Sequence, residues 1–179
     1  MQIRAVILAA GASRRAGIQK LLADFRGRRM IDYAIAVAME WQPLVVAGPR
    51  VAEALGQTSG VTVLRNPQAD RGMSYSLKLA DAQLPKEAWL MLLLGDKPLV
   101  SEAMIRTLCR SLEGADVIYP VHTQSGEPGH PVFFSPAARA KIAALDDGDT
   151  IQRIRDDGEL LRRTVPTMEE GAFFDVDAL

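Results

Sequence analysis

Cysteine and histidine are scarce in this chain, and their scarcity excludes two kinds of site. Cys109 is the only cysteine, so no disulfide can form within the chain, which suits a reducing cytoplasm. Only two histidines accompany it, and together they are too few for an ordinary zinc site. We therefore expect a cytoplasmic protein that is held together by its hydrophobic core.

Long apolar runs and a strong net charge are absent as well. The longest unbroken apolar stretch runs from Ala88 to Leu94, which is far too short to span a bilayer. The N-terminal apolar run leads into Arg14 and Arg15, unlike a secretory signal. The net charge of −1 argues against a general binder of nucleic acid or of membrane surfaces. A chain of 179 residues, 48% of them hydrophobic, predicts a single domain over residues 1–179.

Short apolar segments alternate with segments of helical periodicity along most of the chain. Strands are expected over residues 3–8, 44–47, 61–64, 89–94, 117–119, 130–134, 160–165 and 173–176. Helices are expected over residues 29–41, 50–56, 74–84, 101–112 and 149–156, with another that begins at Ser135-Pro136. This order predicts an α/β sandwich with a mainly parallel sheet, in which ligands bind at the carboxyl ends of the strands.

The loop after the first expected strand has the composition of a phosphate-binding loop. The apolar run stops at Ala9-Ala10-Gly11, and Arg14, Arg15 and Lys20 follow closely. Small residues let the backbone approach a ligand, and the cations suit phosphates. The loop is not a Walker motif, because Lys20 does not directly follow a glycine and no Ser or Thr comes after it, and it also lacks G-x-G-x-x-G.

A carboxylate follows the most apolar expected strand, in Gly95-Asp96-Lys97-Pro98. Mg²⁺ usually takes one or two carboxylates together with substrate phosphates, so Asp96 is a candidate ligand; the alternative is an aspartate that caps a turn. Asp175 and Asp177 would point to one face of an extended segment, unless they belong to a solvated tail. The loops after Leu8 and Leu94 both lie at strand ends and are expected to face one crevice.

Five motifs, taken in order, resemble those of the MobA-like nucleotidyltransferases and, within that group, the molybdenum cofactor cytidylyltransferases. They are the L-A-A-G-x-S-x-R-x-G…K signature of residues 8–20, Gly72-Met73-Ser74-Tyr75-Ser76-Leu77, Gly95-Asp96-x-Pro98, Gly129-His130-Pro131-Val132 and Asp175-Val176-Asp177. The resemblance covers essentially the whole chain. It implies a three-layer α/β/α, Rossmann-like fold of the GT-A-like kind.

The resemblance also implies a reaction and a set of site residues. A phosphate oxygen of the acceptor attacks the α-phosphorus of a nucleoside triphosphate, and pyrophosphate leaves. Arg14 would neutralise the β- and γ-phosphates, and Lys20 the charge around the α-phosphate. Asp96 and Asp177 would hold Mg²⁺. The nucleotide would further be held by backbone groups and small residues at Leu8, Ala9, Ala10, Gly11, Gly72, Met73 and Ser74.

The substrates follow from the resemblance alone. Ala9-Ala10-Gly11 is the A-A-G form of the motif, which favours CTP, whereas the A-G-G form goes with guanosine nucleotides. The implied acceptor is the molybdopterin cofactor. The resemblance also implies a client molybdoenzyme or its chaperone as a partner. Neither nucleic acid nor a membrane is an expected partner. His130 is the candidate contact with the acceptor, although a structural histidine beside Pro131 is an equal alternative.

Three departures from the family pattern keep other functions open. Lys97 stands where Met or Gln is common, and residues 148–153 lack the second glycine of G-D-x-G-A-R. The chain stops soon after Asp177, and a terminus that frays holds a cation poorly. Lys97 and the shortened end support the alternative of a non-catalytic carrier of the molybdenum cofactor. A separate alternative keeps the nucleotide chemistry and changes the acceptor to a sugar phosphate or methylerythritol phosphate.

Overall fold

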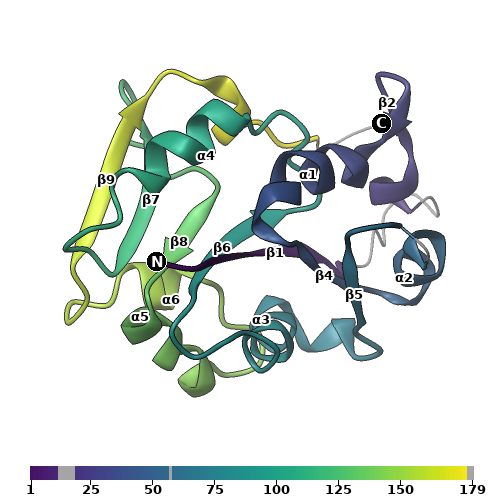
Figure 1. The fold of residues 1–179 in the computed structure, drawn as a ribbon, viewed down its shortest axis with the longest axis horizontal. Coiled ribbons are helices and arrows are strands. Elements are labelled where there is room, and N and C mark those ends of the chain that lie inside the picture. Colours follow the sequence, from purple (N-terminus) through teal and green to yellow (C-terminus); the bar gives the residue numbers. More distant parts are fainter. Residues whose placement is uncertain (12–18, 57, 177–179) are drawn as a thin grey trace.

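A seven-stranded sheet forms the centre of the computed structural model, which describes residues 1–11, 19–56 and 58–176 (Figure 1). Its strands are β1 (Ile3–Ala9), β4 (Leu44–Ala47), β5 (Thr62–Arg65), β6 (Trp89–Leu94), β7 (Val117–His122), β8 (Val132–Phe134) and β9 (Arg162–Thr167). The α-helices are α1 (Met30–Ala38), α2 (Pro49–Leu55), α3 (Met73–Asp81), α4 (Glu102–Cys109), α5 (Pro136–Ala140) and α6 (Gln152–Arg155). A short ribbon of β2 (Asp24–Phe25) and β3 (Arg28–Arg29) precedes α1.

The strand order of the large sheet is β5-β4-β1-β6-β8-β7-β9. The four strands from β5 to β6 run parallel to one another, and β9 runs parallel to β7. The exception is β8, which is antiparallel to both β6 and β7, because the direct connection from β7 turns the chain back along its neighbour. The predicted α/β fold with a mainly parallel sheet is confirmed.

Two apolar clusters hold the helices against the sheet, one on each face. The helices α1, α2 and α4 pack on the face that includes Ile7 and Met91. The helices α3, α5 and α6 pack on the opposite face, with Val6 and Leu92. Neighbouring strand residues therefore point into different layers, and burial on both faces explains why β1 and β6 are continuous apolar runs. This is the expected three-layer α/β/α arrangement.

Serine side chains begin two of the helices, as the sequence predicts. The Ser101 hydroxyl oxygen accepts a hydrogen bond from the Met104 amide at 3.1 Å, and the Ser135 hydroxyl oxygen accepts one from the Ala138 amide at 3.2 Å. Each bond satisfies an amide that has no partner inside its helix. Pro136 occupies the first turn of α5, where its fixed backbone angle is already helical.

The C-terminal part of the chain departs from the predicted strands. β9 lies at the edge of the sheet with most of its side chains exposed, a position where a proline such as Pro166 is tolerated. The strand expected over residues 173–176 is wrong. A 3-10 turn, Glu170–Ala172, is followed there by irregular chain, and the buried Val176 packs against the core without a strand partner among the described residues.

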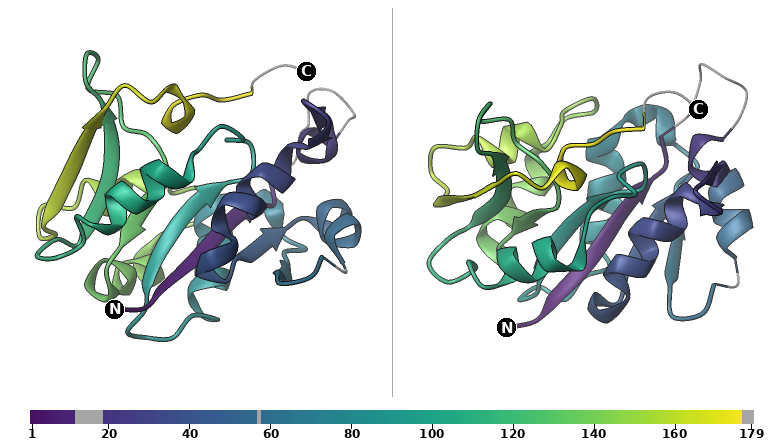
Figure 2. Two further views of the ribbon diagram at one scale, coloured as in Figure 1. Left: turned by 45° about the horizontal axis from the view of Figure 1, so that its top comes forward. Right: turned by 90° about the horizontal axis from the view of Figure 1, so that it is seen from above.

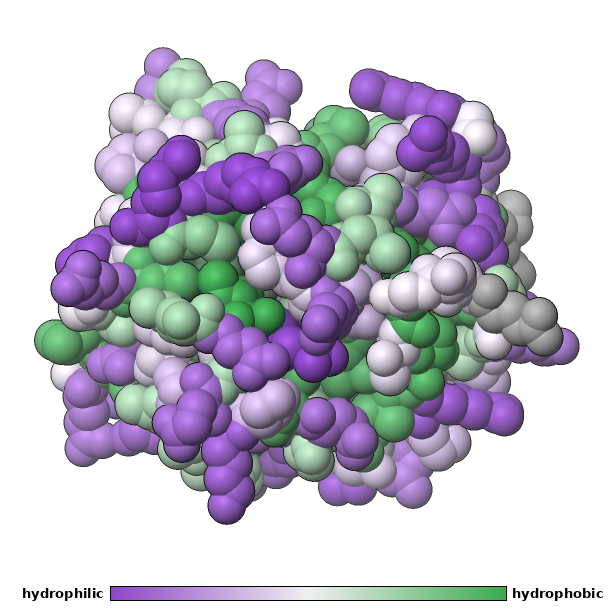
Figure 3. Space-filling model, in the orientation of Figure 1, coloured by the Kyte–Doolittle hydropathy of each residue, from purple (hydrophilic) through white to green (hydrophobic). Residues whose placement is uncertain are grey.

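Hydrophilic side chains cover most of the surface seen in Figure 3, with smaller apolar patches between them. This agrees with a composition in which 24% of the residues are charged. Within the described part of the chain, no helix has both the length and the apolar character that a membrane span requires.

Candidate active site

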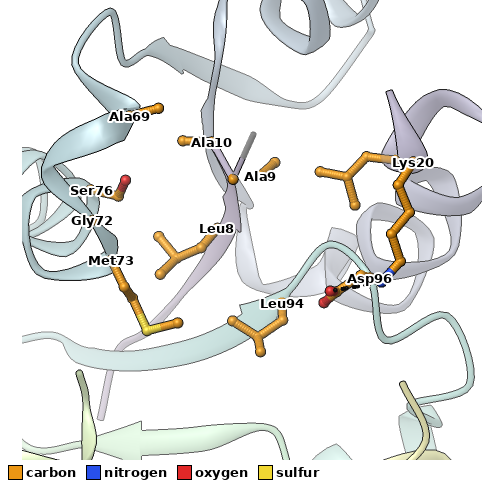
Figure 4. A pocket seen from close by; sticks show the side chains of 12 residues that line it. Leu8, Ala9, Ala10, Lys20, Ala69, Gly72, Met73, Ser76, Leu94 and Asp96 are labelled. Atoms are coloured by element: carbon orange, nitrogen blue, oxygen red, sulfur yellow. Dashed lines mark hydrogen bonds and ion pairs between the residues drawn. The ribbon is translucent and has the colours of Figure 1, made fainter. Parts of the chain in front are cut away.

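A cavity of about 400 Å³ opens at the carboxyl ends of β1 and β6 (Figure 4). In a mainly parallel sheet this edge is the usual place for a ligand. The lining residues come from four segments of the chain: Leu8, Ala9, Ala10, Gly11, Lys20, Leu21, Ala69, Gly72, Met73, Ser76, Leu94 and Asp96. The two loops that were expected to share a crevice therefore do so, and the start of α3 forms the opposite wall.

Lys20 and Asp96 form an ion pair on one wall of this cavity (Figure 4). The Lys20 ammonium nitrogen lies 3.4 Å from a carboxylate oxygen of Asp96, and the two side chains are 25% and 35% exposed. Lys20 reaches over from the 3-10 turn Lys20–Leu22, and Asp96 comes from the loop after β6. The pair places one cation and one carboxylate at the cavity wall, the groups needed to hold phosphate oxygens and a divalent cation.

Gly95 brings Asp96 to the end of β1. Its amide donates a hydrogen bond to the Leu8 carbonyl at 3.0 Å. A β-carbon at this position would lie 3.3 Å from the same carbonyl oxygen and 3.4 Å from the Leu21 side chain. The absence of a side chain therefore lets the loop after β6 close directly over β1, and this closure carries Asp96 toward Lys20.

Gly72 shapes the wall opposite that ion pair, at the start of α3. Its φ of +93° lies in the region that favours glycine, and an added β-carbon would lie 3.3 Å from the Gly148 backbone nitrogen. The Gly148 amide also donates to the Arg71 carbonyl at 3.3 Å. Residues 146–149 therefore support the start of α3 from behind, and they do not line the cavity.

A family model described as the MobA-like NTP transferase domain matches residues 5–164. The chain belongs to this family. It is thus a member of a nucleotidyltransferase family, and the cavity with Lys20 and Asp96 lies within the matched region. A search of curated proteins finds no match.

Solved structures agree with the fold of a MobA-like nucleotidyltransferase. Rv0371c from Mycobacterium tuberculosis superposes with a TM-score of 0.82 at 26% identity, covering 93% of this chain and 88% of that one. A nucleotidyl transferase from Methanothermobacter gives 0.81 at 23% identity, covering 98% and 92%. Molybdopterin-guanine dinucleotide biosynthesis protein A from Archaeoglobus fulgidus gives 0.75 at 18% identity, covering 98% and 93%.

Most of the predicted nucleotide-binding residues of this MobA-like chain line the cavity, but Ser74 does not. Ser74 is 1% exposed, and its hydroxyl has no hydrogen-bond partner in the part of the chain that the structure describes. Ser76 lines the cavity instead and accepts a hydrogen bond from the fully buried Asn66 amide group at 2.9 Å. Met73 and Ser76 are three residues apart and share one helix face, which is the signal that indicates Ser76.

His130 lies outside the cavity, beneath the C-terminal segment. Its backbone amide donates to the Ala172 carbonyl at 2.8 Å. Burial, and then the positive charge of Lys97, lower the pKa of the imidazole to about 4. The ring is therefore neutral near pH 7. It does not line the cavity with Lys20 and Asp96, and its contact with an acceptor stays a prediction.

Two predicted residues, Arg14 and Asp177, fall outside the described residues. Among those that are described, no three His, Cys, Asp or Glu side chains converge on one point, and Asp96 is the carboxylate that lines the cavity. The described part of the chain therefore offers one acidic ligand, at a wall that also carries an ammonium group. This donor set suits a cation that is shared with substrate phosphates better than one enclosed by protein ligands.

A second cavity of about 290 Å³ lies near the turn that follows β7. Its lining combines an imidazole, two carboxylates and two aromatic rings: His122, Ser125, Glu127, Glu170, Phe173 and Phe174. The His122 ring meets the Phe173 ring edge to face, with centroids 5.2 Å apart. The motifs considered in the sequence did not indicate this cavity, because its residues come from segments that only the fold brings together.

Proposed function

We propose that this chain is a Mg²⁺-dependent nucleotidyltransferase of the cytoplasm, with residues 1–179 as one domain, that transfers CMP from CTP to a molybdopterin-type acceptor. The observation that carries the proposal is the ion pair of Lys20 with Asp96 on the wall of the 400 Å³ cavity. Family membership supports transfer of a nucleotidyl group. The names of the substrates rest on the motifs in the sequence.

The nucleotide would bind against the end of β1. Ala9, Ala10 and Gly11 line the cavity there, and an added β-carbon on Gly11 would meet nothing within 4 Å. The backbone amides of this stretch can therefore come close to phosphate or base. The Lys20 ammonium group would donate to an α-phosphate oxygen, and Arg14 would do the same for the β- and γ-phosphates. Gly72 and Met73 would lie against the base.

Asp96 would hold the divalent cation, with Asp177 as the expected second ligand. The partly exposed carboxylate fits this role because it faces the cavity and has room for phosphate oxygens beside it. A structure of Rv0371c in complex with manganese supports a divalent cation in this family. When bound, such a cation screens the triphosphate charge from an anionic nucleophile.

The chain itself has little covalent chemistry to perform. A phosphate oxygen of the acceptor forms a bond to the α-phosphorus, the bond to the β-phosphate oxygen breaks, and pyrophosphate carries away the electron pair. The attacking oxygen is already anionic, so no side chain has to remove a proton. The protein contributes alignment and charge stabilisation, and Lys20 does both where it contacts the α-phosphate.

A thermal-shift comparison of CTP, GTP, ATP and UTP, each with Mg²⁺, tests the nucleotide. A ligand that binds only the folded state raises its stability by mass action. We expect the largest shift with CTP. Equal shifts with CTP and GTP would contradict the proposed specificity for cytidine. The absence of a shift with any nucleotide would contradict the proposed site.

Pyrophosphate release tests the acceptor, with CTP and Mg²⁺ present throughout. Molybdopterin cofactor should support release, while methylerythritol phosphate and sugar phosphates should not. Release with methylerythritol phosphate alone would reassign the acceptor and keep the nucleotide chemistry. Binding of the cofactor without release under any condition would favour a carrier that delivers it to a client molybdoenzyme.

A further inference from the structure

Lys97 is a buried ammonium group that the nucleotide cavity does not use. The residue is 6% exposed and does not line that cavity. Its ammonium nitrogen lies 2.8 Å from a carboxylate oxygen of Asp175 and donates to the Phe173 carbonyl at 3.2 Å. A buried charge needs such partners, and both come from one short segment near the C-terminus.

That segment, residues 169–176, is called the C-terminal strap here. It leaves β9 and crosses the molecule beside the loop after β6 (Figure 2). The contact is close, because a β-carbon on Gly171 would lie 1.9 Å from the Leu99 carbonyl oxygen. The Ala172 carbonyl also accepts from the His130 amide at 2.8 Å. No strand pairs with the strap among the described residues, so its position depends on these contacts and on the packing of its buried residues Ala172 and Val176.

The strap supplies one wall of the second cavity. Glu170, Phe173 and Phe174 all belong to it and line that cavity with His122 and Glu127. Phe173 makes both contacts: its carbonyl accepts the hydrogen bond from Lys97, and its ring lines the cavity. A shift of the strap would therefore move the ring. Aromatic faces beside carboxylates suit a planar heterocycle that carries N–H groups.

We infer that Lys97 is a positioning residue, which holds the C-terminal strap so that its aromatic side chains form the acceptor side of the active site. This inference rests on the proposed nucleotidyl transfer. Lys97 directly follows Asp96 in the chain, so the candidate cation ligand and the anchor of the strap are consecutive residues. The second cavity would receive the planar part of the acceptor, and Lys97 would set its position relative to Asp96.

Lys97→Met is the informative variant. Methionine has a similar length and no charge, and Asp175, with its side chain 48% exposed, loses little when its partner is removed. Asp175→Asn removes the negative charge of the Lys97–Asp175 ion pair. Asp175→Glu keeps that negative charge, and the exposed position leaves room for the longer side chain. Lys141→Met is the matched control, because Lys141 pairs with Asp157 and Glu159, which belong to neither cavity.

Hydrogen exchange reports the position of the strap without any assay of activity. In the wild type, the amides of Ala172, Phe173 and Phe174 donate to carbonyls within the strap at 2.8–3.1 Å. We expect these amides and that of His130 to exchange faster in Lys97→Met and Asp175→Asn, and at the wild-type rate in Asp175→Glu and Lys141→Met. The double variant Lys97→Met/Asp175→Asn should exchange no faster than Lys97→Met alone, because the single change already breaks the ion pair of Lys97 with Asp175.

Steady-state kinetics then separate the two substrates. We expect Lys97→Met to raise the KM for the acceptor roughly tenfold through misplacement of the strap. The Kd for CTP measured without Mg²⁺ should stay within about twofold of wild type, because Lys97 does not line the nucleotide cavity and Asp177, the expected cation ligand that follows the strap, is not engaged without the cation. An equal loss of affinity for both substrates would contradict a positioning role on the acceptor side.

The outcomes distinguish this inference from the proposed function. Unchanged amide exchange in Lys97→Met would overturn the inference even if the wild type is an active transferase. If the wild type releases no pyrophosphate with any acceptor, the proposed function fails and the inference fails with it, whatever the exchange experiment shows of the strap.

Discussion

Lys20 and Asp96 are 76 positions apart in the sequence, and their charged groups lie 3.4 Å apart at the ends of β1 and β6. The parallel pairing of these strands brings the two loops to the same edge of the sheet. Gly95 then closes the loop over β1. The central ion pair of the candidate site is thus a direct consequence of strand topology and one small residue.

Replacing Asp96 by Asn should abolish most of the activity and leave the fold intact. The carboxylate is about one third exposed, and an ion pair of this kind stabilises the fold by at most about 1 kcal/mol. Loss of the anionic ligand should lower kcat by roughly 10²–10³-fold. Pyrophosphate release and the urea midpoint measure the two effects. A drop in stability that matches the drop in activity would count against a role in the reaction.

Replacing Lys20 by Met should have two effects of opposite sign. Turnover should fall, because the α-phosphate loses a cation where negative charge develops. The Mg²⁺ concentration for half-maximal activity should also fall, because a positive charge no longer lies beside Asp96. Lys20→Arg keeps the charge and is the matched control for the second effect. A Mg²⁺ requirement that rises in Lys20→Met would contradict this account of the pair.

Most of the residues that line the 400 Å³ cavity could be predicted from the sequence. Leu8 to Gly11, Lys20, Gly72, Met73 and Asp96 all line it, because motifs that follow parallel strands meet at one edge of the sheet. The roles of all these residues stay predictions, and Arg14 and Asp177 lie outside the described residues.

The features that the sequence did not indicate depend on long-range packing. Whether Ser74 or Ser76 faces the cavity depends on the rotation of α3 about its axis, which the packing of Leu77 and Ala80 in the core determines. The ion pair of Lys97 with Asp175 joins two segments that are separated in the sequence by most of the C-terminal half of the chain. Local pattern contains neither kind of information. Of the apolar residues that predicted a strand over residues 173–176, Val176 instead packs against the core and Phe173 against the His122 ring.

Gly72→Ala should destabilise the protein and weaken nucleotide binding together. At a φ of +93° an alanine is strained, and its β-carbon would also press on the Gly148 backbone at 3.3 Å. Strain of this kind costs about 1–3 kcal/mol. Gly158→Ala is the control, because nothing lies within 4 Å of its added β-carbon. Urea unfolding measures the difference, and equal stability of the two variants would show that Gly72 is not constrained.

His130 should make the stability of the fold depend on pH on the acidic side of neutrality. The pKa of its imidazole is lowered from 6.5 to about 4, first by burial and then by the charge of Lys97. Between these values the unfolded chain binds a proton that the folded chain does not, so the free energy of unfolding falls as the pH falls. Above pH 6.5 the imidazole is neutral in both states, and this contribution is complete.

A variant that cannot titrate, His130→Gln, isolates this contribution from that of the carboxylates. From pH 6.5 down to pH 4 the wild type should lose roughly 1–3 kcal/mol more than the variant, since each unit of pKa difference corresponds to about 1.4 kcal/mol. Urea unfolding at closely spaced pH values gives the difference curve. A flat curve would mean that burial and the charge of Lys97 do not lower the pKa of the imidazole in the folded state.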